Sequence, residues 1–310
     1  MSRRVAAVTI IAATLVCTAA GAPFDSHEFT SELMLAPFDS RESTSGLTFA
    51  QGRQVTEGKT AGGIAYDVQG TGPIVVLLSG SNLDRRMWAH ETAWLAKTRT
   101  VVRYDLRAHG QSDTATAPFS HLDDFLGLLD ELKIARATLI GLSAGSTIAL
   151  DAALAVPDRV ERIVLAGPAP SGYVPKTAPP FTADLIAALK AADYKKVTEV
   201  LLATPVFAAP PAMQPLVRQM VTENDRMWTI PRALMKGSPQ PAMPRLESVR
   251  VPTLILIGDQ DALQREPAEL LAARIPGARI VRVAGGGHLL NLTSPNEFQS
   301  AVAAFLANHP

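Results

Sequence analysis

The chain has 310 residues, of which 47% are hydrophobic and 19% charged, and its formal net charge is zero. This length and composition predict a globular protein with a large core and exclude a disordered chain. The neutral charge balance does not indicate a nucleic-acid surface or a polybasic membrane patch, so we expect a small, neutral or modestly polar molecule as its partner.

The first 22 residues have the three-part pattern of a secretory signal peptide. Arg3 and Arg4 precede an uncharged run over residues 5–20, and small residues follow to Ala22. The alternative is a membrane anchor, but the run is shorter than the roughly 20 apolar residues of a membrane span. We therefore expect a secreted or periplasmic protein with no stable span after signal removal. The single cysteine, Cys17, lies inside this leader, so the exported chain would contain neither a disulfide nor a thiol nucleophile.

Residues 23–58 show little periodicity and are rich in Ser, Thr and Glu. The pentapeptide Ala-Pro-Phe-Asp-Ser occurs twice, at residues 22–26 and 36–40. A short duplication in a polar stretch predicts a disordered tether. We expect order to begin near Gly63, within a domain that spans residues 59–310.

Apolar runs and helical patterns alternate through the rest of the chain. Helices are expected at about residues 87–96 and 122–132 and directly after residue 143, and strands are expected at residues 63–68, 74–78, 100–104, 137–140, 162–166, 252–257 and 278–283. Continuous apolar runs are typical of strands buried on both faces, and their alternation with helices predicts a mostly parallel, doubly wound α/β sheet.

Residues 168–250 interrupt this alternation. The segment is rich in Pro and Met, with helical patches at residues 182–192 and 213–227. An insertion of this length before the penultimate strand predicts a helical lid over the carboxyl ends of the strands, where open α/β sheets bind ligands.

The motif Gly141-Leu142-Ser143-Ala144-Gly145 follows an apolar strand and leads directly into a helical stretch. This context predicts a nucleophile elbow, in which a sharp turn exposes Ser143 at the end of a central strand. Gly141 and Gly145 would lie where the two arms of the turn are too close for a Cβ atom. The first N–H of the helix, that of Ala144, would point toward a developing oxyanion.

A serine hydroxyl needs a base, and that base needs an acid to orient it. Of the six histidines, His309 lies next to the carboxyl end, and only His288 lies in the loop directly after the last strand, where neighbouring glycines let the chain fold back over the elbow. The acid is expected between Ser143 and His288, where Asp259 and Asp261 both follow the strand that ends at Gly258. We expect Asp261 to be the triad acid and Asp259 to serve the turn.

These motifs, together with residues 78–81 and the run 104–112, occur in the order seen in α/β-hydrolases, which the chain resembles from about residue 63 to its carboxyl end. The resemblance implies the α/β-hydrolase fold and a serine-nucleophile mechanism. It also implies a second oxyanion donor in the loop after the strand at residues 74–78, here the backbone N–H of Ser81, with Asn82 next in line. Residues 78–88 and 102–105 look most like the 3-oxoadipate enol-lactonase branch.

The expected function is therefore hydrolysis of a carboxylic ester or lactone through Ser143, His288 and Asp261 and an acyl-enzyme. No metal or organic cofactor is implied, since neither a metalloprotease helix motif nor a dinucleotide loop is present. Carbon–carbon hydrolase, peptidase and perhydrolase chemistry stay open within the fold, as does a slow ligand-binding receptor. The sequence does not fix the oligomeric state.

Two groups of residues bear on the substrate. Trp228 and four lid methionines are expected either to line the pocket or to pack the lid onto the core. The methionines are Met213, Met220, Met227 and Met235. Arg85 and Arg86 lie next to the loop that carries Ser81. They are expected to be exposed surface residues, with contact to an anionic substrate as the alternative.

Overall fold

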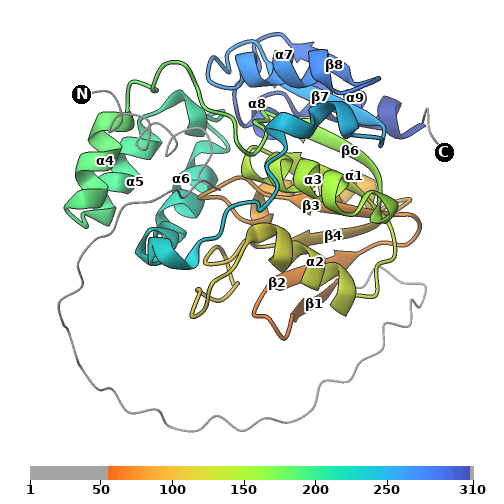
Figure 1. Ribbon diagram of the computed structural model, residues 1–310, viewed down its shortest axis with the longest axis horizontal. Coiled ribbons are helices and arrows are strands. Elements are labelled where there is room, and N and C mark those ends of the chain that lie inside the picture. Colours follow the sequence, from red (N-terminus) through yellow and green to blue (C-terminus); the bar gives the residue numbers. More distant parts are fainter. Residues whose placement is uncertain (1–54, 308–310) are drawn as a thin grey trace, which may run out of the picture.

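The computed structural model describes residues 55–307. The expected signal peptide, Cys17 and nearly all of the expected tether lie outside these described residues. Figure 1 shows a central sheet with helices on both faces and a group of helices, α4 to α6, beyond one end of it.

The sheet has eight strands in the order β1-β2-β4-β3-β5-β6-β7-β8. β1 and β2 pair antiparallel, as do β2 and β4, and the other pairings are parallel. The strands are β1 (Thr56–Lys59), β2 (Ala65–Gln69), β3 (Ile74–Leu78), β4 (Thr100–Tyr104), β5 (Ala137–Leu142), β6 (Val160–Ala166), β7 (Thr253–Gly258) and β8 (Arg279–Val283). The predicted α/β-hydrolase fold with a mostly parallel sheet is confirmed.

The first strand was not expected. β1 crosses the boundary that the sequence predicts at residue 58 between the tether and the folded domain. Its residues are mostly exposed, and its backbone pairs with β2 at the edge of the sheet. A strand held by backbone hydrogen bonds alone needs no apolar alternation, so the sequence pattern did not reveal it. The prediction that order begins near Gly63 is wrong by several residues.

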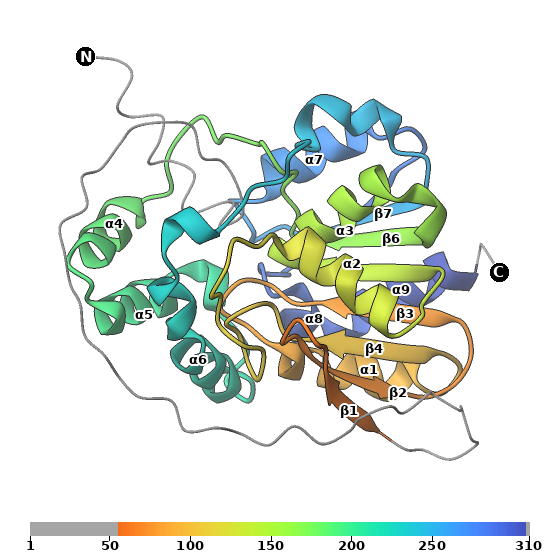
Figure 2. The ribbon, with the colours of Figure 1, turned by 60° about the horizontal axis from the view of Figure 1, so that its bottom comes forward.

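Helices cover both faces of the sheet (Figure 2). α2, α3 and α7 pack over one face and contribute Phe125, Ile148 and Leu271 to its core, and α1, α8 and α9 pack over the other. The helices outside the lid are α1 (Ala89–Leu95), α2 (His121–Glu131), α3 (Ala144–Ala155), α7 (Arg265–Arg274), α8 (Leu290–Thr293) and α9 (Pro295–Ala307), with the short helices η2 (Arg85–Trp88) and η3 (Pro157–Arg159). β5, buried along its whole length, lies between the two cores, which explains its continuous apolar run.

The lid connects β6 to β7 and therefore starts at the carboxyl ends of the parallel strands. It contains α4 (Thr182–Lys190), α5 (Tyr194–Leu202), α6 (Gln214–Glu223) and the short helices η4 (Pro205–Phe207), η5 (Asp225–Thr229), η6 (Arg232–Leu234) and η7 (Met243–Ser248). α4 and α6 lie in the expected helical patches, whereas α5 was not expected. Within residues 55–307, no helix combines the length and the apolar character needed to cross a bilayer.

Candidate active site

Ser143 lies at the junction of β5 and α3. Its backbone has φ 54° and ψ −115°, a left-handed conformation that a non-glycine residue adopts only under constraint. The constraint is visible in the hydrogen bond from the Ser143 N–H to the Ala166 carbonyl at the end of β6, 2.9 Å long. The strand, the sharp turn and the helix expected for a nucleophile elbow are all present.

The two motif glycines leave no room for a side chain. A Cβ at position 141 would lie 2.4 Å from the Gly145 carbonyl carbon, and one at position 145 would lie 2.0 Å from the Leu78 carbonyl oxygen. Both distances are far below van der Waals contact, so the backbone arms of the elbow meet each other and β3 directly. The steric reason given by the sequence for both glycines agrees with these distances.

Asp261 and His288 form a buried pair at the carboxyl ends of β7 and β8. The distance from His288 Nδ1 to Asp261 Oδ2 is 2.7 Å, and both residues are only 4% exposed. Their loops pack closely, because a Cβ at Gly258 would lie 2.1 Å from the Gly286 carbonyl oxygen. With Nδ1 donating to the carboxylate, the Nε2 atom of His288 is left to accept a proton.

Asp259 has the turn role that the sequence predicts for it. Its Oδ1 atom accepts hydrogen bonds from the Gly285 N–H and from the Gln260 side chain, each 2.9 Å long. It therefore joins the loop after β7 to the loop after β8, while Asp261 faces His288.

The end of β6 brings the predicted serine and the Asp261–His288 pair together. Ser143 is hydrogen-bonded to Ala166, and the next residue, Gly167, lies beside the Asp261–His288 pair. A Cβ at Gly167 would lie 3.0 Å from His288 Nδ1 and 3.2 Å from Asp261 Oδ2. Two consecutive residues at the end of β6, Ala166 and Gly167, therefore lie against the elbow and against the Asp261–His288 pair.

The loop after β3, residues 79–84, runs beside the elbow. We call it the oxyanion loop, because it carries the predicted backbone donor Ser81. A Cβ at Gly80 would lie 3.5 Å from Ser143 Cβ, so the loop backbone runs beside the predicted nucleophile. Ala144, the first residue of α3, has an N–H with no carbonyl partner in its own helix. The Asn82 N–H is already bonded to His109 Nε2 at 3.0 Å, which leaves the Ser81 N–H as the candidate loop donor.

His109, which the sequence excluded as a base, fixes this loop. Its Nδ1–H donates to the Arg107 carbonyl at 2.9 Å and its Nε2 accepts from Asn82, so the ring is the neutral Nδ1–H tautomer. Burial lowers the pKa of His109 to about 4. The neutral ring can therefore hold Asn82 in its left-handed conformation, φ 60°, at neutral pH.

Asn224, from the lid, was not singled out by the sequence. It is fully buried, and its Nδ2 donates to the Asn82 carbonyl at 3.2 Å and to Asp84 Oδ2 at 3.1 Å. Its Oδ1 accepts from the Gly110 N–H at 2.7 Å. One lid side chain thus ties the oxyanion loop to the loop after β4, and no local sequence pattern marks it.

The expectation of exposed arginines is wrong for Arg85. This residue is 8% exposed, and its guanidinium pairs with Asp67 at 3.0 Å and with Asp105 at 2.7 Å. Arg86 is partly exposed and pairs with Asp84 at 2.7 Å and with Glu223 of the lid at 2.5 Å. Both arginines are used in ion pairs that hold the segment after the oxyanion loop.

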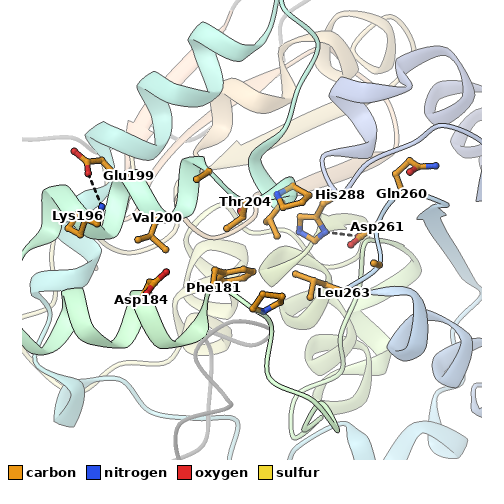
Figure 3. Close-up of a pocket in the computed structure, with 15 residues that line it drawn as sticks. Phe181, Asp184, Lys196, Glu199, Val200, Thr204, Gln260, Asp261, Leu263 and His288 are labelled. Carbon is orange, nitrogen blue, oxygen red and sulfur yellow. Dashed lines mark hydrogen bonds and ion pairs between the residues drawn. The ribbon is translucent and has the colours of Figure 1, made fainter.

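A cavity of about 590 Å³ lies between the lid and the loops after β7 and β8. Figure 3 shows His288 and Asp261 at one end and Lys196, Glu199 and Asp184 at the other. Its lining is largely apolar and includes Pro180, Phe181, Val200, Ala203, Pro205, Val206, Ala262 and Leu263. A volume of about 300–1,000 Å³ is typical of small-molecule sites.

The lid methionines do not line this cavity. Met220 and Met227 are buried at 0% and 5% exposure and belong to hydrophobic clusters that join the lid to the rest of the domain, and Met213, Trp228 and Met235 pack against these clusters. Of the two expected roles, packing therefore describes them. Within residues 55–307, no group of three or more His, Cys, Asp or Glu side chains is arranged to hold a metal ion.

The fold and this arrangement agree with the comparisons. A model of the alpha/beta hydrolase family matches residues 75–301, so the chain belongs to that family. A curated relative from Caulobacter vibrioides, named "Putative carbamate hydrolase RutD", is 29% identical over 82% of this chain and 98% of its own length.

Two solved structures show the same likeness. A hydrolase from Pseudomonas aeruginosa aligns with a TM-score of 0.66 and 29% identity, over 81% of this chain and 98% of that one. The enol-lactonase from Burkholderia xenovorans aligns with a TM-score of 0.69 and 25% identity, over 81% of this chain and 100% of that one. The expected resemblance to α/β-hydrolases, and to an enol-lactonase among them, is confirmed.

Proposed function

We propose that the chain is an exported serine hydrolase that cleaves a carboxylic ester or lactone. The observation that carries the proposal is the buried 2.7 Å bond between Asp261 and His288, beside the strand end to which Ser143 is bonded. Family membership supports a hydrolase. The names of an enol-lactonase and a carbamate hydrolase among the similar proteins support an acyl substrate.

In this mechanism Asp261 holds His288 as the Nδ1–H tautomer, and Nε2 takes the proton of Ser143 as its Oγ attacks the carbonyl carbon. The backbone N–H groups of Ser81 and Ala144 stabilise the oxyanion of the tetrahedral intermediate. His288 then protonates the leaving oxygen, and afterwards activates the water that hydrolyses the acyl-enzyme. No step requires a metal or an organic cofactor.

A labelling and turnover experiment tests the assignment. The protein should react with a fluorophosphonate at Ser143 and show a burst on short p-nitrophenyl esters. Ser143→Ala should abolish labelling and lower kcat by about 10⁴-fold or more, because the nucleophile is lost. The exposed Ser248→Ala is the matched control and should behave as wild type. A Ser143→Ala protein with wild-type turnover would refute the proposal, and wild-type protein without labelling would favour a ligand-binding role.

Carbamate hydrolysis is a second candidate, favoured by the name of the Caulobacter vibrioides relative. A carbamate presents the same carbonyl carbon to Ser143 and the same developing oxyanion, so the catalytic groups would be unchanged. Comparing kcat/KM for an aryl carbamate and the matching aryl ester would rank the two substrates.

Export is also part of the proposal and rests on residues 1–22. Expression of the full-length chain in a bacterium, followed by fractionation and amino-terminal sequencing of the product, tests whether this leader is removed.

A further inference from the structure

The cavity beside His288 lies on one side of the predicted catalytic site. Of the predicted catalytic residues, His288 and Asp261 line it, and they come from the loops after β7 and β8. The predicted loop donor, Ser81, lies on a different loop, which runs beside Ser143. Hydrogen bonds from Asn82 to His109 and from Asn224 to Asn82 hold this loop in place. A substrate at Ser143 thus has an oxyanion side and an imidazole side.

The proton transfers of acylation decide which part of an ester lies on the imidazole side. A bond forms between Ser143 Oγ and the carbonyl carbon, and the bond from that carbon to the leaving oxygen breaks. The proton of Ser143 passes to His288 Nε2 and from there to the leaving oxygen. Proton transfer needs a heavy-atom distance of about 2.6–3.2 Å, so the leaving oxygen and the group attached to it must lie against the imidazole.

The cavity wall next to the imidazole is apolar. Figure 3 shows Phe181 and Leu263 near His288, with Val200 farther along toward α5. These side chains come from the start of α4, from the loop after β7 and from α5, so three separate elements enclose the same space. Such a wall binds an alkyl or aryl group and offers few partners to a polar one.

The far end of the cavity is charged, but its one lysine is already paired with a carboxylate. Lys196 is paired with Glu199 at 3.4 Å, and Asp184 adds a second carboxylate to the wall. One ammonium among two carboxylates leaves a negative balance there. A carboxylate at the end of a bound chain would therefore be repelled, whereas an uncharged chain would not.

We propose that this cavity binds the leaving-group side of the substrate, and that the group it binds is an uncharged apolar chain or ring. The inference rests on the proposed serine-hydrolase function and adds its substrate class: esters of apolar alcohols, with the alcohol in the cavity and the acyl group elsewhere. Lactones fit when the alkyl substituent lies on the alcohol carbon.

Two series of esters test this assignment. In the first, the acyl group is always acetyl and the alcohol grows from methyl to decyl; in the second, the alcohol is always ethyl and the acyl chain grows. The measured quantity is kcat/KM, because it includes binding and acylation but not the later hydrolysis of the common acyl-enzyme. In the alcohol series kcat/KM should rise by up to about fourfold per methylene until the cavity is filled. Replacing the terminal methyl by a carboxylate should reverse that gain.

A pair of matched variants locates the effect. Ala203 is exposed at the end of α5 and lines the cavity, whereas Ala187 is exposed on α4 and does not line it. Ala203→Trp should lower kcat/KM for the long alcohols by at least tenfold more than it lowers kcat/KM for methyl acetate, because the indole takes up space that only a long alcohol needs. Ala187→Trp should leave both series unchanged. Phe181→Ala, which widens the cavity, should raise kcat/KM for branched alcohols relative to linear ones.

The outcomes separate the two proposals. A loss confined to long acyl chains in Ala203→Trp, or an alcohol series with no length dependence in an active enzyme, would overturn the leaving-group assignment and leave the serine hydrolase intact. Wild-type protein that neither hydrolyses any ester nor reacts with a fluorophosphonate would overturn the proposed function and this inference with it.

Discussion

The two sides of the candidate site are built from different interactions. On the oxyanion side, Asn82 and Asp84 are almost fully buried, at 2% and 1% exposure, and polar bonds from His109 and Asn224 hold the loop. On the cavity side, apolar side chains form the wall, and the ion pair at its far end is more than half exposed. The first side fixes backbone atoms, whereas the second defines a shape.

This difference predicts different responses to substitution. Donors held in advance stabilise an oxyanion without reorganisation, and a buried polar group that loses its partner costs about 1–3 kcal/mol. Changes on the oxyanion side should therefore lower the turnover of every substrate. Changes in the apolar wall should alter which substrate is preferred.

The largest effect is expected from the buried hydrogen bond between Asp261 and His288, the polar contact at the catalytic end of the cavity. Asp261→Asn should lower kcat by about 10⁴-fold, because an amide in place of the carboxylate favours the wrong tautomer of His288. Asp259→Asn is the matched control on the same loop and should change kcat less than tenfold. Turnover of p-nitrophenyl acetate by both variants checks the assignment, and a larger loss in Asp259→Asn would exchange the two roles.

A smaller but uniform loss is expected on the oxyanion side. Asn224→Asp removes the amide that donates to the Asn82 carbonyl and to Asp84, and it adds a buried negative charge beside that carboxylate. Because the loop that carries the Ser81 N–H would shift, kcat/KM should fall by about 10²–10³-fold, the typical cost of one oxyanion donor. KM for short and long alcohols should change by the same factor.

A merely structural role of Asn224 would give another result. The affinity for a trifluoromethyl ketone, which forms a tetrahedral adduct, should fall in parallel with kcat/KM, while an amide that mimics the ground state should bind as before. Asn296→Asp, at an exposed position on α9, adds the same charge and should leave both unchanged. Equal loss of both inhibitors would contradict the positioning role.

The comparison also explains what could be predicted from the sequence. The elbow was predictable because its glycines are required by local contacts. The candidate acid and base could be chosen because each follows a predicted strand in a fixed chain order. The parallel sheet followed from apolar runs that reflect burial on both faces, as in β5.

The interactions that hold the oxyanion loop were not predictable in this way. Asn224 bonds to Asn82 across 142 residues, and its sequence surroundings are those of an ordinary helix end. The burial of Arg85 depends on Asp67, in β2, and on Asp105, which directly follows β4. Such contacts arise only when distant segments pack, so composition and periodicity give no sign of them.

A further contrast concerns two buried carboxylates. Burial alone would raise the pKa of Asp84, but hydrogen bonds from Arg86 and Asn224 outweigh it and hold that pKa below its usual range. Asp151, on α3 behind the elbow, accepts a 2.6 Å hydrogen bond from the Ser171 hydroxyl, with Ser238 and Arg245 as weaker influences. Here burial prevails and raises the pKa of Asp151 to about 6.

The smallest expected effect follows from Asp151 and is one of stability. A carboxyl whose pKa is raised in the folded state binds its proton more tightly there than in the unfolded chain, so the free energy of unfolding decreases as pH rises from about 4 to about 6. Asp151→Asn keeps an acceptor for Ser171 and removes the charge, and it should raise the free energy of unfolding by up to about 3 kcal/mol at pH 7. The gain should vanish below pH 4, as measured by urea denaturation at both pH values beside the exposed control Asp158→Asn. A gain that is the same at both pH values would mean that packing, rather than the buried charge, sets the cost of Asp151.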